Sequence, residues 1–295
     1  KTHGILVFKD FTTILQLAAD TRMEILQQLR EIYDGAFYKR VGKSGSVPIA
    51  WQGKVTFIAG VTEFYEEFRQ IDQTLGERYL LYKNKIKNRI AMALKSASHI
   101  NKEKKMTQEL FEVTRAYHNS VFIDKNINNL IIPENITLKL AYLSDLITRL
   151  RSSVKRNWKD DISQIPMPEA PSRMMNQLLV LMKALAVIHK NVEVTDEEFR
   201  IASRVGFMTV ANDRQKIIDF MLKNTQEMSI HEIANGIKYP LTTTWRTLQN
   251  LLYFDIIENL GFEQKEREPS RLVLTDYFKD ALDKIGLKLK QNENT

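Results

Sequence analysis

The sequence predicts an α/β segment, a long helical region and a small C-terminal module of helices and two short strands, so that helix predominates overall. Three observations support this prediction. Short apolar runs alternate with helical or loop segments over residues 1–80, residues 83–206 are almost wholly helical in pattern, and residues 212–282 join capped helices to two β-like runs.

In the first segment, apolar runs predict strands at residues 5–8, 54–60 and 78–82, and helical patterns cover residues 20–33 and 62–71. Strands that alternate with helices imply a parallel sheet that is covered on its faces. The stretch between residues 35 and 53 is rich in glycine, serine and basic residues, which is typical of an exposed loop.

The helical region contains two long amphipathic helices. The first, over residues 136–158, has an apolar stripe and a basic back, and the second follows an extended connector set by Pro166, Pro168 and Pro171. Thr195 and Glu198 match a capping box that opens a helix over residues 197–205. The apolar stripe of the first helix is Leu143, Ile147, Leu150 and Val154, and the basic residues on its opposite face are Arg149, Arg151, Lys155 and Arg156. The apolar stripe of the second helix is Leu178, Met182, Leu185 and Ile188.

The C-terminal pattern is typical of a winged helix. A helix over residues 213–223 precedes a second capping box, Ser229 to Glu232, whose helix stops at Gly236. A helix over residues 241–253 and β-like runs at 256–260 and 272–274 follow. On a helical wheel of residues 241–253, the inward set is Leu241, Trp245, Leu248 and Leu252, and the outward set is Thr243, Arg246 and Asn250.

Such a module places its second helix in the major groove of DNA, where arginine and asparagine can contact bases and threonine can contact phosphates. The predicted DNA contacts are Thr243, Arg246, Thr247 and Asn250 on the helix and Lys265, Arg267 and Arg271 in the wing. The alternative is a winged helix that contacts proteins instead of DNA. The acidic residues Glu263, Glu266 and Glu268 in the wing favour this alternative, because DNA phosphates repel carboxylates.

Composition narrows the possible classes of protein. The chain has 295 residues, of which 43% are apolar and 27% charged, and no run is long enough to span a membrane. The absence of cysteine excludes disulfides, a thiolate nucleophile and cysteine-based zinc sites, and the histidines are too dispersed for a local ligand motif. The net charge of +7 and pI near 9.3 suit a polyanion such as DNA. We expect a soluble protein that is cytoplasmic or associated with the nucleoid.

The first strand ends in Lys9 and Asp10, and the second ends at Thr62. In P-loop ATPases a strand-end carboxylate lies beside the magnesium that bridges the β- and γ-phosphates. Further along, Gly76, Glu77, Arg78 and Tyr79 are followed much later by Arg173, which opens a helix running through Gln177 and Leu178.

This order resembles the C-terminal half of an AAA+ ATPase core, in particular minichromosome maintenance (MCM) helicases and their relatives on mobile elements. The resemblance implies that Asp10 belongs to Walker B and holds Mg²⁺, that Thr62 is sensor 1, that Arg78 is the arginine finger and that Arg173 is sensor 2. The sequence departs from the family where a single acid replaces Asp-Glu and Thr62 replaces asparagine. Alternatively, Asp10 caps the next turn, Arg78 is salt-bridged or solvated, and Arg173 merely begins a helix.

The resemblance also implies an ATP-dependent DNA helicase, translocase or replication initiator that binds ATP and Mg²⁺ and works as a homo-hexameric ring. An arginine finger that acts on the neighbouring subunit's nucleotide accelerates hydrolysis by about three to five orders of magnitude. The basic loop that contains Tyr38, Lys39, Arg40 and Lys43 faces either the pore or solvent.

A phosphate-binding loop is not found in this sequence. Gly42, Lys43 and Ser44 invite that interpretation, but the motif requires glycine where Phe37 stands, and the stretch follows the Walker B candidate. We therefore expect the P-loop to lie upstream of Lys1, and this chain by itself to be inactive as an ATPase.

The expected organisation is half of an AAA+ core at residues 1–90, a helical lid at 91–210, a winged helix at 211–285 and a flexible tail at 286–295. Two other classes remain open at this point. The chain is either a non-catalytic winged-helix DNA-binding regulator with a degenerate ATPase remnant, or an assembly platform whose helical region makes protein contacts.

Overall fold

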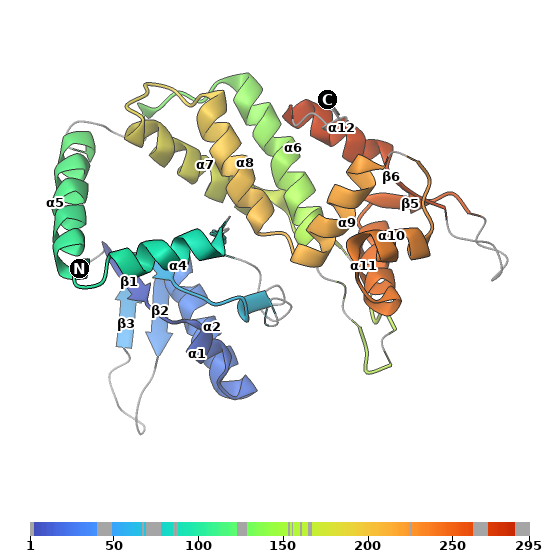
Figure 1. Cartoon of the computed structure of the whole chain (residues 1–295), viewed down its shortest axis with the longest axis horizontal. Helices are drawn as coiled ribbons and strands as arrows, with labels where there is room; N and C mark the ends of the chain where they lie inside the picture. Colours follow the sequence, from blue (N-terminus) through green and yellow to red (C-terminus); the bar gives the residue numbers. More distant parts are fainter. Residues whose placement is uncertain are drawn as a thin grey trace. The chain divides into compact units, whose positions relative to one another are not determined.

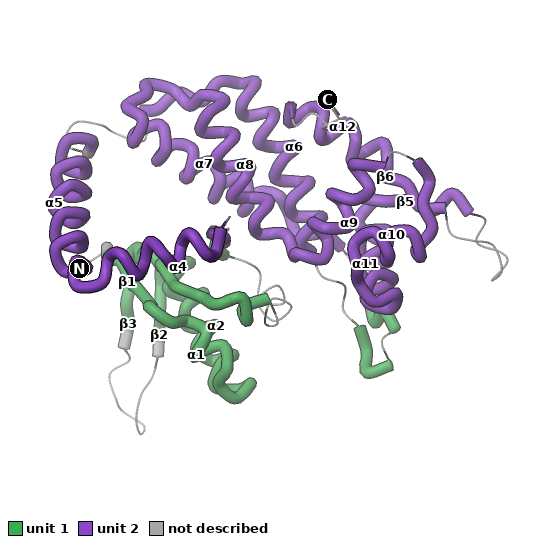
Figure 2. The backbone as a smooth tube through the Cα atoms, viewed as in Figure 1, with its two compact units in different colours: residues 1–79, 153–163 green, residues 80–152, 164–295 purple. Residues whose placement is uncertain are grey.

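The computed structural model describes residues 3–39, 49–66, 68, 78–84, 86, 88–122, 129–152, 154, 156–159, 161–164, 167–224, 226–261 and 271–286. Helices predominate in this part of the chain, as the sequence predicts (Figure 1). The chain divides into two compact units, residues 1–79 with 153–163 and residues 80–152 with 164–295 (Figure 2). Each unit is described by itself below.

Unit 1 contains a parallel pair of strands and an antiparallel pair. Strand β1 (His3–Phe8) leads through α1 (Thr12–Leu15) and α2 (Ala19–Asp34) to β2 (Ala36–Lys39), β3 (Ile49–Gln52) and β4 (Lys54–Ala59). β1 and β4 pair in parallel, with Phe8 opposite Ala59, which confirms the parallel pairing expected for these two runs. Both strands therefore end at the same edge of the sheet.

One face of this small sheet is packed and the other is open. Leu6, Phe8 and Phe57 pack against a core made by Phe11, Leu15, Leu26 and Leu29. Because successive side chains of a strand point to opposite faces, Ile5, Val7 and Ile58 point away from this core, and they are 69%, 61% and 53% exposed. The expectation of a sheet covered on both faces is wrong for the described residues.

Two further predictions for unit 1 are corrected. Residues 35–53 are not wholly a loop, because β2 and β3 form an antiparallel ladder with Phe37 opposite Trp51, a cross-strand aromatic pair that favours strand. Residues 78–82 are not a strand; Tyr79 instead packs its ring on Phe57, with centroids 4.8 Å apart. The predicted helix at 62–71 is described only in part, and it is helical at residues 65, 66 and 68.

Unit 2 begins with two helices, α4 (Arg89–Ser98) and α5 (Glu103–Phe122), followed by three that pack together. Helices α6 (Glu134–Arg151), α7 (Pro171–Ile188) and α8 (Asp196–Met208) lie side by side (Figure 1). Their predicted stripes are largely confirmed; the stripe residues that are fully buried are Leu143, Ile147, Leu150, Leu178 and Met182. The capping box at Thr195 and Glu198 is present, with both of its bonds.

Helix α6 ends at Arg151, earlier than the predicted residue 158, and the reason is tertiary. The guanidinium of the buried Arg214 donates to the carbonyls of Leu150 and Ser152, both at 2.6 Å. These carbonyls lack partners within the helix, so Arg214 caps the helix from another element. Arg151 is 1% exposed and paired with Glu169, so it does not belong to the predicted basic back.

The described residues in the C-terminal part of unit 2 form α9 (Asn212–Lys223), α10 (Ile230–Ile237), α11 (Leu241–Tyr253), β5 (Ile257–Asn259), β6 (Leu272–Leu274) and α12 (Asp276–Ile285). β5 and β6 are antiparallel, and Met228 forms a bridge to Leu272 beside them. The Ser229–Glu232 capping box is confirmed, whereas α12 was not predicted as an element. Gly236 permits close packing of α9 on α10, because a Cβ there would meet the Phe220 ring at 2.2 Å.

Candidate nucleotide and DNA sites

Asp10 and Thr62 lie together at the carboxyl edge of the parallel strands. Gly60 donates from its backbone N–H to the Phe8 carbonyl at 2.9 Å, and Phe11 donates to the Gly60 carbonyl at 2.9 Å, so the two chains stay joined just beyond the ladder. A Cβ on Gly60 would meet the Lys9 carbonyl oxygen at 2.6 Å, so only glycine permits this approach. Ligands of open α/β sheets bind outside this edge.

Thr12 connects the two predicted residues, and no pattern in the sequence singles it out. Its hydroxyl oxygen accepts from the Thr62 backbone N–H at 3.0 Å and lies 3.3 Å from the Thr62 hydroxyl oxygen. Its own backbone N–H donates to the Asp10 carboxylate at 3.1 Å. Asp10, Thr12 and Thr62 therefore form one polar cluster. A threonine two residues after a strand-end aspartate is too common a pattern to have identified this role.

The cluster fits a limited role in magnesium binding. Asp10 is exposed, so its carboxylate is accessible to a hydrated ion. Among the residues that the structure describes, no group of three or more histidine, aspartate or glutamate side chains is arranged to hold a metal. Mg²⁺ commonly takes one or two protein carboxylates and completes its shell with water and phosphate oxygens, so a single carboxylate suits a magnesium that arrives with nucleotide.

Arg78 lies at the other end of unit 1 and is engaged. Its side chain is 8% exposed, and it donates to both carboxylate oxygens of Asp34, at 3.3 Å from Nε and 2.9 Å from a terminal nitrogen. Asp34 ends α2, and Gly53 donates to the Gly35 carbonyl at 3.0 Å, which places the end of α2 beside the start of β4. Arg78 is thus salt-bridged, with Asp34 as its partner, and is remote from Asp10 within the unit.

Arg173 lies in the first turn of α7, in unit 2. It donates to one carboxylate oxygen of Glu169 at 3.3 Å, and its side chain is 38% exposed. The other oxygen of Glu169 accepts from the buried Arg151 at 2.5 Å. Of the four predicted nucleotide-site residues, the structure therefore brings Asp10 and Thr62 together, and it places Arg78 and Arg173 in separate ion pairs.

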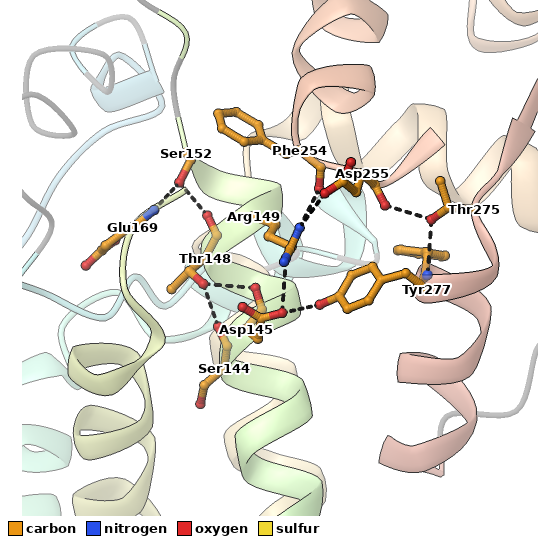
Figure 3. A network of polar contacts seen from close by, with 11 residues as sticks. Ser144, Asp145, Thr148, Arg149, Ser152, Glu169, Phe254, Asp255, Thr275 and Tyr277 are labelled. Carbon is orange, nitrogen blue, oxygen red and sulfur yellow. Dashed lines mark hydrogen bonds and ion pairs between the residues drawn. The ribbon is translucent and has the colours of Figure 1, made fainter. Parts of the chain in front are cut away.

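A polar network runs from Glu169 along α6 to the C-terminal elements (Figure 3). The Glu169 backbone N–H donates to the Ser152 hydroxyl at 2.9 Å, and this hydroxyl donates to the Thr148 carbonyl at 2.7 Å. One turn away, Arg149 donates to Asp145 and to Asp255, both at 3.0 Å. The bond between Arg149 and Asp255 therefore links residues on the two sides of the predicted boundary at residues 210 and 211.

Tyr277 completes this network from α12. Its hydroxyl donates to Asp145, and the Arg149 guanidinium lies 4.5 Å from the centre of its ring. Burial and the neighbouring carboxylate raise the pKa of Tyr277, so it remains a neutral donor. Burial alone would lower the pKa of Arg149, but attraction and hydrogen bonding to Asp145, together with the neighbouring Tyr277 and Asp255, outweigh burial and raise that pKa. At this contact, α6 therefore contributes the charged side chains of Asp145 and Arg149, and α12 contributes the neutral side chain of Tyr277.

Helix α11 exposes part of the predicted DNA-contacting set. Thr243 and Arg246 are exposed and Asn250 is half-buried. Thr247, also predicted to contact DNA, is 4% exposed, and its hydroxyl donates to Asp213 at 2.7 Å, so it does not lie on this exposed face. Arg271 forms an exposed ion pair with Glu227 at 3.4 Å, and the other two predicted wing contacts, Lys265 and Arg267, lie outside the described residues.

The buried face of α11 is rotated relative to the predicted one. Leu248 is buried as expected, but Leu241 and Trp245 are 42% and 38% exposed, and the other buried positions are Thr244, Thr247 and Leu251. A wheel that counts threonine as polar misses this face. The Thr244 hydroxyl donates to the Pro240 carbonyl at 3.0 Å and the Thr247 hydroxyl to Asp213, so both can be buried with their hydrogen bonds made.

A scan against known protein families finds no family model that matches the chain, and a comparison with curated proteins finds none that matches it in sequence. In the helices that the structure describes, none combines the length and apolar character that crossing a membrane requires.

Proposed function

We propose that the C-terminal part of the chain is a winged-helix module that binds DNA through the exposed face of α11. The observation that carries this proposal is the face itself: Thr243, Trp245 and Arg246 are exposed, while the threonines behind them are buried and hydrogen-bonded. Arginine, threonine and an aromatic ring are side chains that contact base edges, phosphates and thymine methyl groups in the major groove.

The order of elements supports this proposal. Helices α9, α10 and α11 precede the antiparallel strands β5 and β6, and Met228 bridges to β6 from the segment between α9 and α10. In the winged-helix arrangement the helix that follows the turn enters the groove, and that helix is α11 here. Lys238 is the C-cap of α10, and the Lys216 ammonium lies 4.5 Å from the centre of the Tyr239 ring in the turn that precedes α11. Both lysines would add phosphate contacts and make the affinity dependent on salt.

The experiment compares DNA affinity of the Arg246→Ala and Arg200→Ala variants by fluorescence anisotropy. Both changes remove one exposed arginine, and Arg200 lies on α8. Loss of a base contact costs about 1–3 kcal/mol, so Arg246→Ala should weaken binding by roughly 5- to 150-fold, and Arg200→Ala should change it little. Equal affinity in the two variants would remove α11 from the DNA interface.

We further propose that this module belongs to an ATP-dependent DNA helicase, translocase or replication initiator of MCM-like AAA+ type, acting as a homo-hexamer. The cluster of Asp10, Thr12 and Thr62 at the carboxyl edge of the parallel strands favours this assignment. ATP and Mg²⁺ would bind at this edge together with a P-loop from outside these residues. Asp10 would hold the ion, and Thr62, oriented by Thr12, would position the attacking water or the γ-phosphate.

The two arginines would act after leaving their present partners. Arg78 would exchange Asp34 for the nucleotide of a neighbouring subunit, and Arg173 would exchange Glu169 for the γ-phosphate. In a protein that also carries the P-loop, Arg78→Ala should abolish hydrolysis while nucleotide still binds. If hydrolysis is unchanged, Arg78 has only its structural ion pair.

The second candidate function is a non-catalytic DNA-binding regulator with a degenerate ATPase remnant. The observation that favours it is the burial of Arg78 in a two-bond ion pair, because extracting a buried arginine costs free energy. The two are distinguished by measuring DNA affinity with and without ATP in a protein that also carries a P-loop, since a regulator would bind DNA with the same affinity whether or not ATP is present.

A further inference from the structure

Glu169 is shared by two arginines of unit 2. One of its carboxylate oxygens accepts from Arg151 at 2.5 Å, and the other accepts from Arg173 at 3.3 Å. The side chain of Arg151 is 1% exposed, whereas that of Arg173 is 38% exposed. Glu169 therefore has a short bond to a buried cation and a long bond to a cation that solvent reaches.

The buried half of this cluster fixes Glu169 in place. The Glu169 backbone N–H donates to the Ser152 hydroxyl at 2.9 Å, and that hydroxyl donates to the Thr148 carbonyl of α6 at 2.7 Å (Figure 3). Moving the carboxylate away from Arg151 would take the counter-charge from a buried guanidinium, which is strongly destabilising. We therefore expect Glu169 to stay where it is when Arg173 moves.

The exposed half of the cluster is placed against the preference of its helix. Arg173 is in the first turn of α7, which begins at Pro171 after Ala170 and has no acidic residue in that turn. The N-terminus of a helix carries a partial positive charge, so a cation there is unfavourable and an anion is favourable. Glu169, the residue before Ala170, supplies the negative charge. Helix stability does not explain an arginine at this position, whereas a phosphate group suits both the guanidinium and the helix end.

On the basis of the proposed function, in which Arg173 contacts the γ-phosphate, we propose that Glu169 is an internal competitor for this arginine. Its carboxylate holds Arg173 until a phosphate group displaces it. The exchange exposes no buried charge, because Glu169 keeps its bond to Arg151 throughout. The bond that has to break is long and partly exposed, and exposed ion pairs are weak, so the competition should lower phosphate affinity by about 1.5- to 5-fold.

The test follows the modification of Arg173 by phenylglyoxal, an arginine-specific reagent, in the chain of residues 1–295. Mass spectrometry quantifies the peptide that carries Arg173, and the exposed Arg200 on α8 is the internal reference. Glu169→Gln should speed the modification of Arg173 and leave that of Arg200 unchanged. Inorganic tripolyphosphate should protect Arg173 at about 1.5- to 5-fold lower concentration in Glu169→Gln than in the unmodified protein. The matched control, Glu197→Gln at an exposed position, should change neither quantity.

A second variant separates this effect from a defect in folding. Glu169→Gln leaves the buried Arg151 beside a neutral amide, so it is compared with Arg151→Met/Glu169→Gln, in which the buried charge is removed as well. Circular dichroism measures how well each variant is folded, and the double variant should release Arg173 to the same extent as the single one. Modification of Arg173 at the unmodified rate in the folded variants, or protection by tripolyphosphate at the unmodified concentration, would overturn the proposal.

Failure of the proposed function gives a different result. In a protein that also carries the P-loop, Glu169→Gln should lower the KM for ATP by about 1.5- to 5-fold, and Arg173→Ala should impair turnover. If Arg173→Ala leaves both KM and turnover unchanged, Arg173 has no role in hydrolysis and the proposed function fails at this residue. If Arg173→Ala impairs turnover but Glu169→Gln leaves KM unchanged, the competition by Glu169 is refuted and the proposed function stands.

Discussion

Glu198 provides the sharpest quantitative test of how unit 2 is held together. Its carboxylate is fully buried and accepts from the Thr195 N–H at 2.8 Å, the Asn191 side chain at 2.9 Å, His189 Nδ1 at 2.5 Å and the Thr195 hydroxyl. Burial alone would raise its pKa, but these hydrogen bonds outweigh burial and lower the pKa from 4.5 to about 2. The ionised form is therefore the form that stabilises the fold.

The size of the effect follows from linkage between protonation and folding. A pKa that falls from 4.5 to about 2 on folding corresponds to roughly 3 kcal/mol of stability, at 1.36 kcal/mol per unit. Because the folded pKa is depressed, this stability is fully present above pH 4.5 and is lost as the pH falls toward 2. Glu198→Gln keeps the shape and removes the charge, so at neutral pH it should lower the free energy of unfolding by about that amount.

The assay is urea unfolding followed by circular dichroism at several pH values, with Glu197→Gln as the control. Glu197 is the exposed neighbour, and its substitution should leave stability nearly unchanged. The difference between the unmodified protein and Glu198→Gln should shrink between pH 4.5 and 2, since both then carry a neutral group. A difference that is absent at pH 7, or constant down to pH 2, would refute the reasoning.

Three other outcomes are expected. Gly236→Ala should destabilise the C-terminal part of unit 2 by about 1–3 kcal/mol in thermal unfolding, because its Cβ would overlap the Phe220 ring, whereas Asn235→Ala at the exposed neighbouring position should not. Thr247→Val should cost about 1 kcal/mol of stability, by removing the hydrogen bond to Asp213, and leave DNA affinity unchanged. Residues 1–295 alone should show essentially no ATP turnover in a phosphate-release assay, and sustained turnover would contradict the proposal of an external P-loop.

Local patterns that satisfy their own hydrogen bonds were predictable from sequence. The capping boxes at Thr195 and Ser229 need only residues three apart, so their presence follows from the chain itself. The β1 and β4 runs were recognisable because each is short and apolar and helical sequence separates them. Their pairing placed Asp10 and Thr62 at one edge, as the order of strand and polar residue implies.

Contacts between distant segments were not predictable. Nothing near Arg78 in the sequence indicates Asp34 as its partner, and nothing near residue 151 indicates that Arg214 ends α6. The buried face of α11 was misassigned because the environment of Thr247 depends on Asp213, which comes from α9. In each case one polar side chain could be either solvated or buried, and the choice depends on whether a partner from elsewhere satisfies it.

By itself, the sequence determined that the chain is mainly helical, where most helices begin, and that two apolar strands lie side by side with their polar ends together. These features depend on backbone periodicity and on bonds between near neighbours, which any local stretch carries. Only the tertiary structure decided which arginines form ion pairs, which threonines are buried and which apolar side chains stay exposed. The free energy of burying a polar or apolar side chain depends on whether residues distant in sequence supply a hydrogen-bond partner or an apolar contact.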